Sequence, residues 1–242
     1  MPPRTVQAPR RRDTKERSHP LAEVPRWVWV ASVVVVAGAA IVISLLSTAG
    51  GSSRPSSDQV RTAMLAAGCT YSEVPPKPPR KDPHDTIGGY HADVPTLSTP
   101  TAGLWSTSPP SGGAHYPAWA VWGFYTSPVN PRQVVHNEEH GGVIIWWGPK
   151  VPASQVAQLQ SFYNASPDGV FGTPYEALGD KIALTAWTGD PTTYYRTSYG
   201  LGHIAVCPTF NEHAFATFRD AFRGQGPEGI PLSADEPGMG PG

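Results

Sequence analysis

Residues 129–147, VNPRQVVHNEEHGGVIIWW, change from one pattern of secondary structure to another at a pair of glycines. The first half carries the signals of a short helix: an N-cap residue, a proline at the first helical position, a capping-box partner and a terminating glycine (Asn130, Pro131, Gln133 and Gly141). The second half, GVIIWW, is short and rich in β-branched and aromatic residues, which is typical of a strand. A helix followed directly by a strand favours a domain that mixes the two.

The same patterns of helix and strand recur elsewhere in the chain. Further helices are predicted over 58–67 with Ser57 as the cap, over 153–164 and over 212–223, and further strands over 119–125, 182–187 and 202–207. In the last helix three phenylalanines at helical spacing are expected to be core residues (Phe215, Phe218 and Phe222). The expected fold is a small mixed α+β domain, with a short antiparallel or mixed sheet flanked by a few helices and preceded by one transmembrane helix.

The amino-terminal segment predicts a membrane anchor. Residues 1–26 carry seven basic and three acidic side chains, although the whole chain has a net charge of −1. Residues 27–46 are uncharged and apolar, and at about 1.5 Å per residue they can cross a hydrocarbon core of about 30 Å. The basic flank predicts a cytoplasmic amino terminus rather than a nucleic-acid-binding arm. The alternative is a cleaved signal peptide with a small-x-small site at Ser47 and Ala49, but the apolar run is longer than a usual signal-peptide core.

The expected organisation is therefore a single-pass protein of the plasma membrane with its carboxy-terminal domain outside the cytoplasm. Its parts are a basic cytoplasmic segment, a transmembrane helix, a linker, an extracytoplasmic domain and a disordered tail (1–26, 27–46, 47–57, 58–228 and 229–242). Prolines are too dense between 74 and 110 for regular structure, but the aromatic residues there predict an ordered loop.

The two cysteines, Cys69 and Cys207, both follow the predicted anchor. In an oxidising compartment they are expected to form a disulfide that closes a long loop. The alternative is two buried thiols. A redox pair is less favoured because the sequence holds no C-x-x-C motif.

The opening helix also gathers side chains that can carry chemistry. On a helix, His136 and His140 are at positions i and i+4 on one face, with Glu139 beside them, so two imidazoles can reach one metal ion. Glu138 is expected to point elsewhere, into solvent. The letters HNEEH also fit H-x-x-E-H, in which the glutamate is the general base of a zinc hydrolase. The alternative is that both histidines only form hydrogen bonds at a helix–strand corner.

The histidines in the loops are the candidates for further metal ligands. His115 ends the turn SPPSGGAHYP, whose prolines and glycines would present its side chain from a rigid loop, and His91 is a weaker candidate. His203 and His213 are interpreted as structural or surface residues, although a strand could also turn His203 toward a site. Zinc or copper is the expected metal, because imidazole and carboxylate suit zinc or Cu(II), whereas soft ligands for Cu(I) are scarce. No phosphate-binding loop or G-x-S-x-G elbow occurs.

The segments SPPSGGAHYPAWAVWGFY and VVHNEEHGGVIIWW, together with the closing RGQGPE, resemble the exported actinobacterial proteins of the domain of unknown function 3105 family. The resemblance covers roughly residues 69–228 and implies an extracytoplasmic domain behind a single anchor. It marks six motif positions: His115, His136, Asn137, Glu139, His140 and Gly141. The chain departs from the family pattern at Gly112, where the family has serine, and at Glu138, where it has leucine. The first argues against a nucleophilic serine in the turn, and the second adds negative charge near the site.

Three functions remain open on the sequence. The favoured one is a membrane-anchored domain that binds a transition metal through His115, His136 and His140, with Glu139 as a ligand or close neighbour. The second is a metal-dependent hydrolase in which Glu139 activates water. The third is a non-catalytic module that binds an envelope protein through a groove of tryptophans (Trp105, Trp119, Trp122, Trp146 and Trp147).

Overall fold

The structure is a computed structural model of the whole chain, and it describes residues 53–77, 96–190 and 199–234. The predicted basic segment and transmembrane helix, most of the linker, and His91 lie outside these residues. Within the described ranges no helix is both long enough and apolar enough to cross a membrane. The chain divides after Ser53, and the unit that begins at Arg54 is the one described below.

One five-stranded sheet with four α-helices makes up the regular structure of the described residues. The helices are α2 (Ser57–Ala66), α3 (Pro131–Glu139), α4 (Ala153–Ala165) and α5 (Glu212–Phe222). The strands are β1 (Thr70–Val74), β2 (Val143–Trp147), β3 (Val170–Pro174), β4 (Ile182–Thr188) and β5 (Leu201–Cys207). The strand order is β1-β5-β4-β2-β3, in which β2 and β3 run parallel and the other neighbours antiparallel. The predicted α+β class with a mixed sheet is confirmed.

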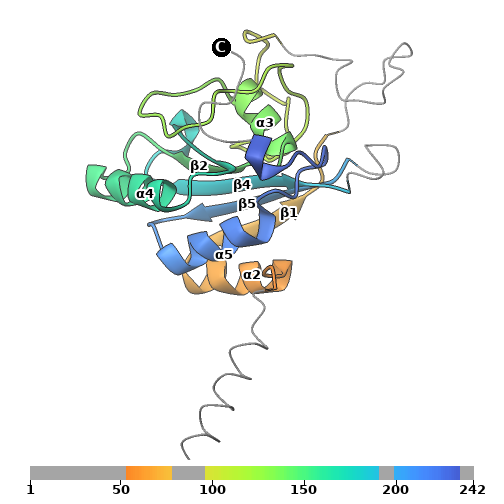
Figure 1. Cartoon of the computed structure of the whole chain (residues 1–242). Coiled ribbons are helices and arrows are strands. Elements are labelled where there is room, and N and C mark those ends of the chain that lie inside the picture. The colour runs from red at the N-terminus through yellow and green to blue at the C-terminus, as the bar shows by residue number, and fades with distance from the viewer. Residues whose placement is uncertain (1–52, 78–95, 191–198, 235–242) are drawn as a thin grey trace, which may run out of the picture. The chain divides into compact units, whose positions relative to one another are not determined.

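The helices cover both faces of the sheet, with α3 on one face and α2 and α5 on the other (Figure 1). The fully buried strand β2 shows the two faces clearly. Val143, Ile145 and Trp147 join the larger core with residues of α2, α4 and α5, whereas Ile144 and Trp146 join a second core that includes Val134 of α3. The period of two along a strand sends alternate side chains into different cores. The functional residues of α3 therefore lie on the face opposite the larger core.

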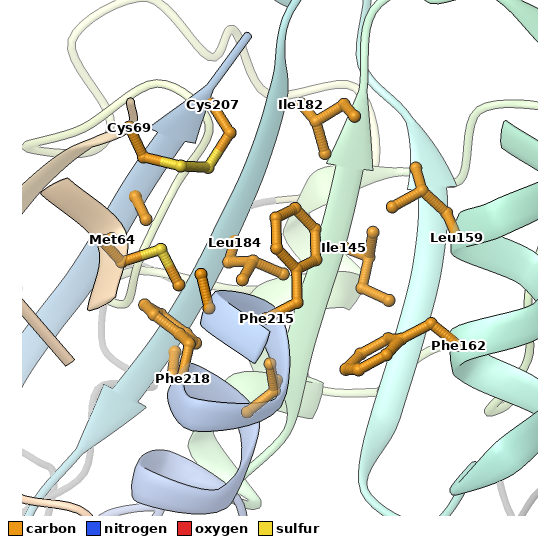
Figure 2. Packing of buried hydrophobic residues seen from close by; sticks show 14 of the residues in the cluster. Met64, Cys69, Ile145, Leu159, Phe162, Ile182, Leu184, Cys207, Phe215 and Phe218 are labelled. Carbon is orange, nitrogen blue, oxygen red and sulfur yellow. A yellow bond between two sulfur atoms is a disulfide. The ribbon is translucent and has the colours of Figure 1, made fainter. Parts of the chain in front are cut away.

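The larger core contains the predicted phenylalanine stripe and the predicted disulfide (Figure 2). Phe215 and Phe218 are fully buried and Phe222 nearly so, which confirms that they are core residues. Cys69 and Cys207 form a disulfide across the β1–β5 pair, with their Cα atoms 4.1 Å apart. The bond ties the edge strand to the sheet and closes a sequence separation of 138 residues.

The ends of the elements differ from the sequence prediction in small ways. The cap of α2 is Ser56 rather than Ser57, and it forms a reciprocal capping box with Gln59. The predicted linker extends to 57, but Arg54 already donates hydrogen bonds to backbone carbonyls at the end of α5. In the predicted disordered tail, Leu232–Ala234 forms a short 3-10 helix.

One predicted strand is wrong and two strands were not predicted. In the described structure residues 119–125 are irregular, and Phe124 alone forms an isolated bridge, to Gly172. The backbone of Ala120 pairs instead with the side chain of Asn137, which accepts from its N–H at 3.0 Å and donates to its carbonyl at 2.9 Å. A side-chain amide thus replaces a neighbouring strand. The strands β1 and β3 carry weak sequence signals.

Candidate metal centre

Helix α3 is built as its sequence predicts and holds most of the site. The side chain of Asn130 accepts the backbone N–H of Arg132 at 3.1 Å, with no reciprocal bond from Gln133, and Pro131 begins the helix. His136, Glu139 and His140 follow at its carboxyl end, where Gly141 adopts a φ of 96° that favours glycine. All three side chains are at least nine-tenths buried. The spacing i, i+3, i+4 therefore brings these three groups to one face, as predicted.

His115 comes to the same place from the predicted turn. Gly112 and Gly113 take φ angles of 121° and 114°, which reverse the chain before His115. The ring donates through Nδ1 to the carbonyl of Gly113 at 2.8 Å, so its orientation is fixed by its own turn. Its Nε2 lies 2.9 Å from Oε2 of Glu139, and the His115 ring centroid is 4.8 Å from that of His136. The imidazole of His115 thus converges with those of α3.

His136 is oriented in the same way as His115. Its Nδ1 donates to the carbonyl of Tyr116 at 2.9 Å, and its Nε2 lies 3.9 Å from Oε2 of Glu139. In metal sites a histidine commonly donates one ring N–H to a carbonyl, which leaves the other nitrogen to bind the ion. Two nitrogens bound at about 2.0–2.1 Å in a tetrahedral shell lie about 3.3 Å apart. The nitrogen–oxygen distances from His115 and His136 to Glu139, 2.9 Å and 3.9 Å, bracket this spacing between two ligand atoms. Small side-chain movements would therefore bring the three donors around one metal ion.

A second group of donors overlaps the first. His115, His136 and Glu139 form an inner group, and His136, His140 and Glu228 form an outer group; within each, the donor atoms lie within 4.8 Å of one another. In the outer group Nε2 of His140 lies 3.3 Å from Oε2 of Glu228. Either group could hold a metal ion.

Glu228 was missed as a site residue because it reaches the site through a distant segment. Gly224 donates its backbone N–H to the carbonyl of Gly141 at 2.8 Å, which docks the segment 224–228 on the end of α3. At Gly226 a Cβ atom would lie 2.2 Å from the carbonyl oxygen of Glu139, so the backbones touch where only glycine fits. The motif RGQGPE was noted in the sequence, but its glycines were the only sign of such a close approach.

The two groups differ in their access to solvent. The side chains of His115 and Glu139 are 1% and 0% exposed, whereas that of Glu228 is 16% exposed. Trp119 is half-buried and packs its ring on His136 and His140, at centroid distances of 5.4 Å and 4.8 Å. The inner group is thus enclosed, and the outer group lies between it and the surface.

The pKa values of the inner imidazoles move in opposite directions. Burial, the largest single effect, lowers the pKa of His115, but the charge and hydrogen bond of Glu139 at 2.9 Å, the carbonyl of Gly113 and the charge of Glu228 together raise it above the ordinary value. Burial, followed by the charge of His115, lowers the pKa of His136 to about 4. Without an ion, the site therefore favours the protonated form of His115 and the neutral form of His136, whose Nε2 then carries a lone pair.

The prediction that Glu138 points into solvent is wrong. It is completely buried and accepts a hydrogen bond from the hydroxyl of Thr185, which in turn accepts from the indole N–H of Trp146 at 2.7 Å. Successive helical side chains point about 100° apart, so Glu138 faces the sheet while Glu139 faces the histidines. Burial raises the pKa of Glu138 well above its ordinary value, against the opposing hydrogen bonds from Thr185 and Gly112. Burial therefore disfavours the negative charge that the sequence interpretation expected at this position.

The two other histidines of the described residues, His203 and His213, are not part of this cluster. His203 lies in β5 between the hydroxyls of Tyr71 and Thr188, and His213 is exposed on α5. His91 lies outside the described residues. The predicted tryptophan groove is also wrong, because four of its five members are buried (Trp105, Trp122, Trp146 and Trp147). Trp119 alone reaches the surface in part, and it covers the histidines.

A family model described as "Protein of unknown function (DUF3105)" matches residues 101–233, which include both histidine segments and Glu228. The match spans more than half of the chain, so the chain belongs to this family. Neither the curated proteins nor the solved structures contain a match to the chain.

Proposed function

We propose that this member of the family binds one divalent transition-metal ion, zinc or copper, through His115, His136 and Glu139. One observation carries the proposal: two buried imidazoles donate their Nδ1 protons to backbone carbonyls and direct Nε2 toward a single buried carboxylate oxygen. A structural histidine needs no such convergence, whereas a metal ligand does. Two nitrogens and one oxygen suit zinc in a tetrahedral shell or Cu(II), and the described cysteines are bonded to each other rather than available as thiolates.

We also propose that the domain works outside the cytoplasm, anchored by residues 27–46. The apolar length of that segment and its basic flank support this placement. The disulfide between Cys69 and Cys207 also supports it, because such bonds persist in oxidising compartments.

Metal analysis of the purified full-length chain tests the binding site. The wild-type protein is expected to hold one zinc or copper ion per chain, and His136→Ala is expected to lose it. His213→Ala is the matched control, because His213 is exposed on α5, away from the cluster. Wild-type protein that takes up neither metal at micromolar concentration would refute the proposal.

A metal-dependent hydrolase is the second candidate, and Glu228 is the observation that favours it. An H-x-x-E-H site needs a third ligand, and the outer group supplies a carboxylate beside His136 and His140. In that arrangement Glu139 would accept the proton of the attacking water. Glu139→Gln separates the two functions: it releases the metal if Glu139 is a ligand, but it preserves the metal and removes peptide or ester hydrolysis if Glu139 is the base.

A further inference from the structure

The two donor groups share one residue, and this restricts how they can be used. His136 donates its Nδ1 proton to Tyr116, so a neutral ring has one lone pair, on Nε2. One lone pair binds one ion. The inner and outer groups are therefore alternative positions for a single ion, not two sites that fill together.

The inner position is difficult to reach directly from water. His115 and Glu139 are 1% and 0% exposed, and Trp119 packs against the ring of His136, the third donor of the inner group. A divalent ion carries tightly held water, and removing that water inside a protein is costly unless ligands replace it. Glu228, at 16% exposure, is the outermost donor of the cluster, and the spacing of 3.3 Å to His140 fits two ligands of one tetrahedral ion.

We infer that His140 and Glu228 form a loading position through which the ion passes to and from the inner group. The ion first exchanges water for the carboxylate of Glu228 and Nε2 of His140, and then binds Nε2 of His136, which belongs to both groups. It next exchanges the outer ligands for Glu139 and His115. Any proton that His115 carries on Nε2 beside Glu139 leaves to water as the ion binds that nitrogen, and no other covalent bond within the protein is made or broken. The inference rests on the proposed metal-binding function.

A loading position has a specific kinetic consequence. It lowers the barrier between the hydrated ion and the inner group, and the same barrier is crossed on release. Its loss therefore slows association and dissociation by the same factor and leaves Kd unchanged. A resting ligand behaves differently, because its loss raises Kd mainly through faster dissociation.

The experiment is stopped-flow binding of Co²⁺ to the full-length chain, followed by its visible absorption, with release measured after addition of a chelator. Glu228→Gln removes the charge at the loading position and keeps the size of the side chain. Both rate constants are expected to fall at least about tenfold, within the range over which a charged cleft accelerates association. Glu176→Gln is the control, since it removes an equal charge from an exposed residue. His140→Gln is a second variant with the same expected result, and unchanged circular dichroism shows that each variant is folded.

Three outcomes of these measurements distinguish a failure of the loading position from a failure of the proposed metal-binding function. A raised Kd with an unchanged association rate in Glu228→Gln makes Glu228 a resting ligand and overturns the inference. Two Co²⁺ ions bound per wild-type chain also overturn it, because the groups would then fill together. Wild-type protein that binds no Co²⁺, zinc or copper refutes the proposed function itself.

Discussion

The buried ring of His203 links the stability of the domain to pH. It is 2% exposed, and its centroid lies 3.8 Å from that of Phe222 in a stacked arrangement. Tyr71 donates its hydroxyl proton to Glu73, so the Nδ1 proton of His203 is directed to the Tyr71 oxygen at 2.9 Å. Nε2 accepts from the hydroxyl of Thr188 at 2.8 Å. The neutral ring is thus satisfied at both nitrogens, and burial lowers its pKa to about 4.

The direction of the effect follows from this pKa. The unfolded histidine has a pKa of about 6.5, so below that pH the unfolded chain binds a proton that the folded chain does not. The contribution of His203 is fully present above about pH 6.5 and is lost as the pH falls toward the folded pKa of about 4. Each pH unit between them changes the free energy of unfolding by about 1.4 kcal/mol. Acidification from about pH 7.5 to about pH 4.5 should therefore remove about 2.5 kcal/mol.

Urea unfolding of the wild type and His203→Gln, both with chelator, measures this contribution. The variant is expected to be less stable at neutral pH, since it loses the stacking on Phe222, but the gap should narrow by about 2.5 kcal/mol at about pH 4.5. His136, whose pKa is also about 4, is present in both proteins and cancels. His213→Gln is the matched control variant, because His213 is an exposed histidine of α5. A gap between wild type and His203→Gln that stays constant with pH would refute the argument from burial.

Three further perturbations test the fold and the docked segment. Cys207→Ser should lower the free energy of unfolding by about 4–5 kcal/mol in the chain-entropy account, measured by urea unfolding, and a reductant should destabilise the wild type but not the variant. Glu138→Ala should lower the free energy of unfolding by about 2–4 kcal/mol in the same assay, because it leaves a cavity and an unpaired Thr185 hydroxyl. Glu138→Gln should lower it by less than half as much, and equal losses in the two variants would contradict a structural role for the hydrogen bond to Thr185. Gly226→Ala should lower the thermal midpoint and slow Co²⁺ loading, because its Cβ would lie 2.2 Å from the Glu139 carbonyl; an unchanged loading rate would show that the segment is not needed there.

Local signals in the sequence were sufficient for the helices and for three of the strands. The caps and apolar spacing of α3 and α5 act within a few residues, so the sequence contains the whole cause. The strands β1 and β3 depend on distant partners instead. The edge strand β1, TYSEV, is mostly polar and is tied to β5 by its ladder and the adjacent disulfide. In β3, VFGTP, Gly172 reads as a break in the sequence, but a Cβ there would lie 2.3 Å from the ring of Phe124.

The residues of the candidate site also separate into those that local sequence signals predict and those that depend on distant contacts. Convergence of His115 with His136 and Glu139 was predicted, because a rigid turn and a helix each present their side chains locally. The presence of Glu228 at the site was not predicted, because it depends on backbone contact between Gly226 and the end of α3, more than eighty residues away in the sequence. The separation of His140 from His115 into different donor groups was also not predicted. It depends on how the turn docks against the helix, which helical spacing alone does not determine.

The adjacent glutamates of α3 show why residue type alone could not assign the site. Glu138 and Glu139 have the same side chain, but one faces Thr185 in the sheet and the other faces two imidazoles. Burial raises the pKa of Glu138 and so disfavours its charged form. Glu139 instead lies 2.9 Å from Nε2 of His115 and 3.9 Å from Nε2 of His136. The direction in which the helix points each residue, rather than its residue type, therefore separates a core residue from a proposed metal ligand.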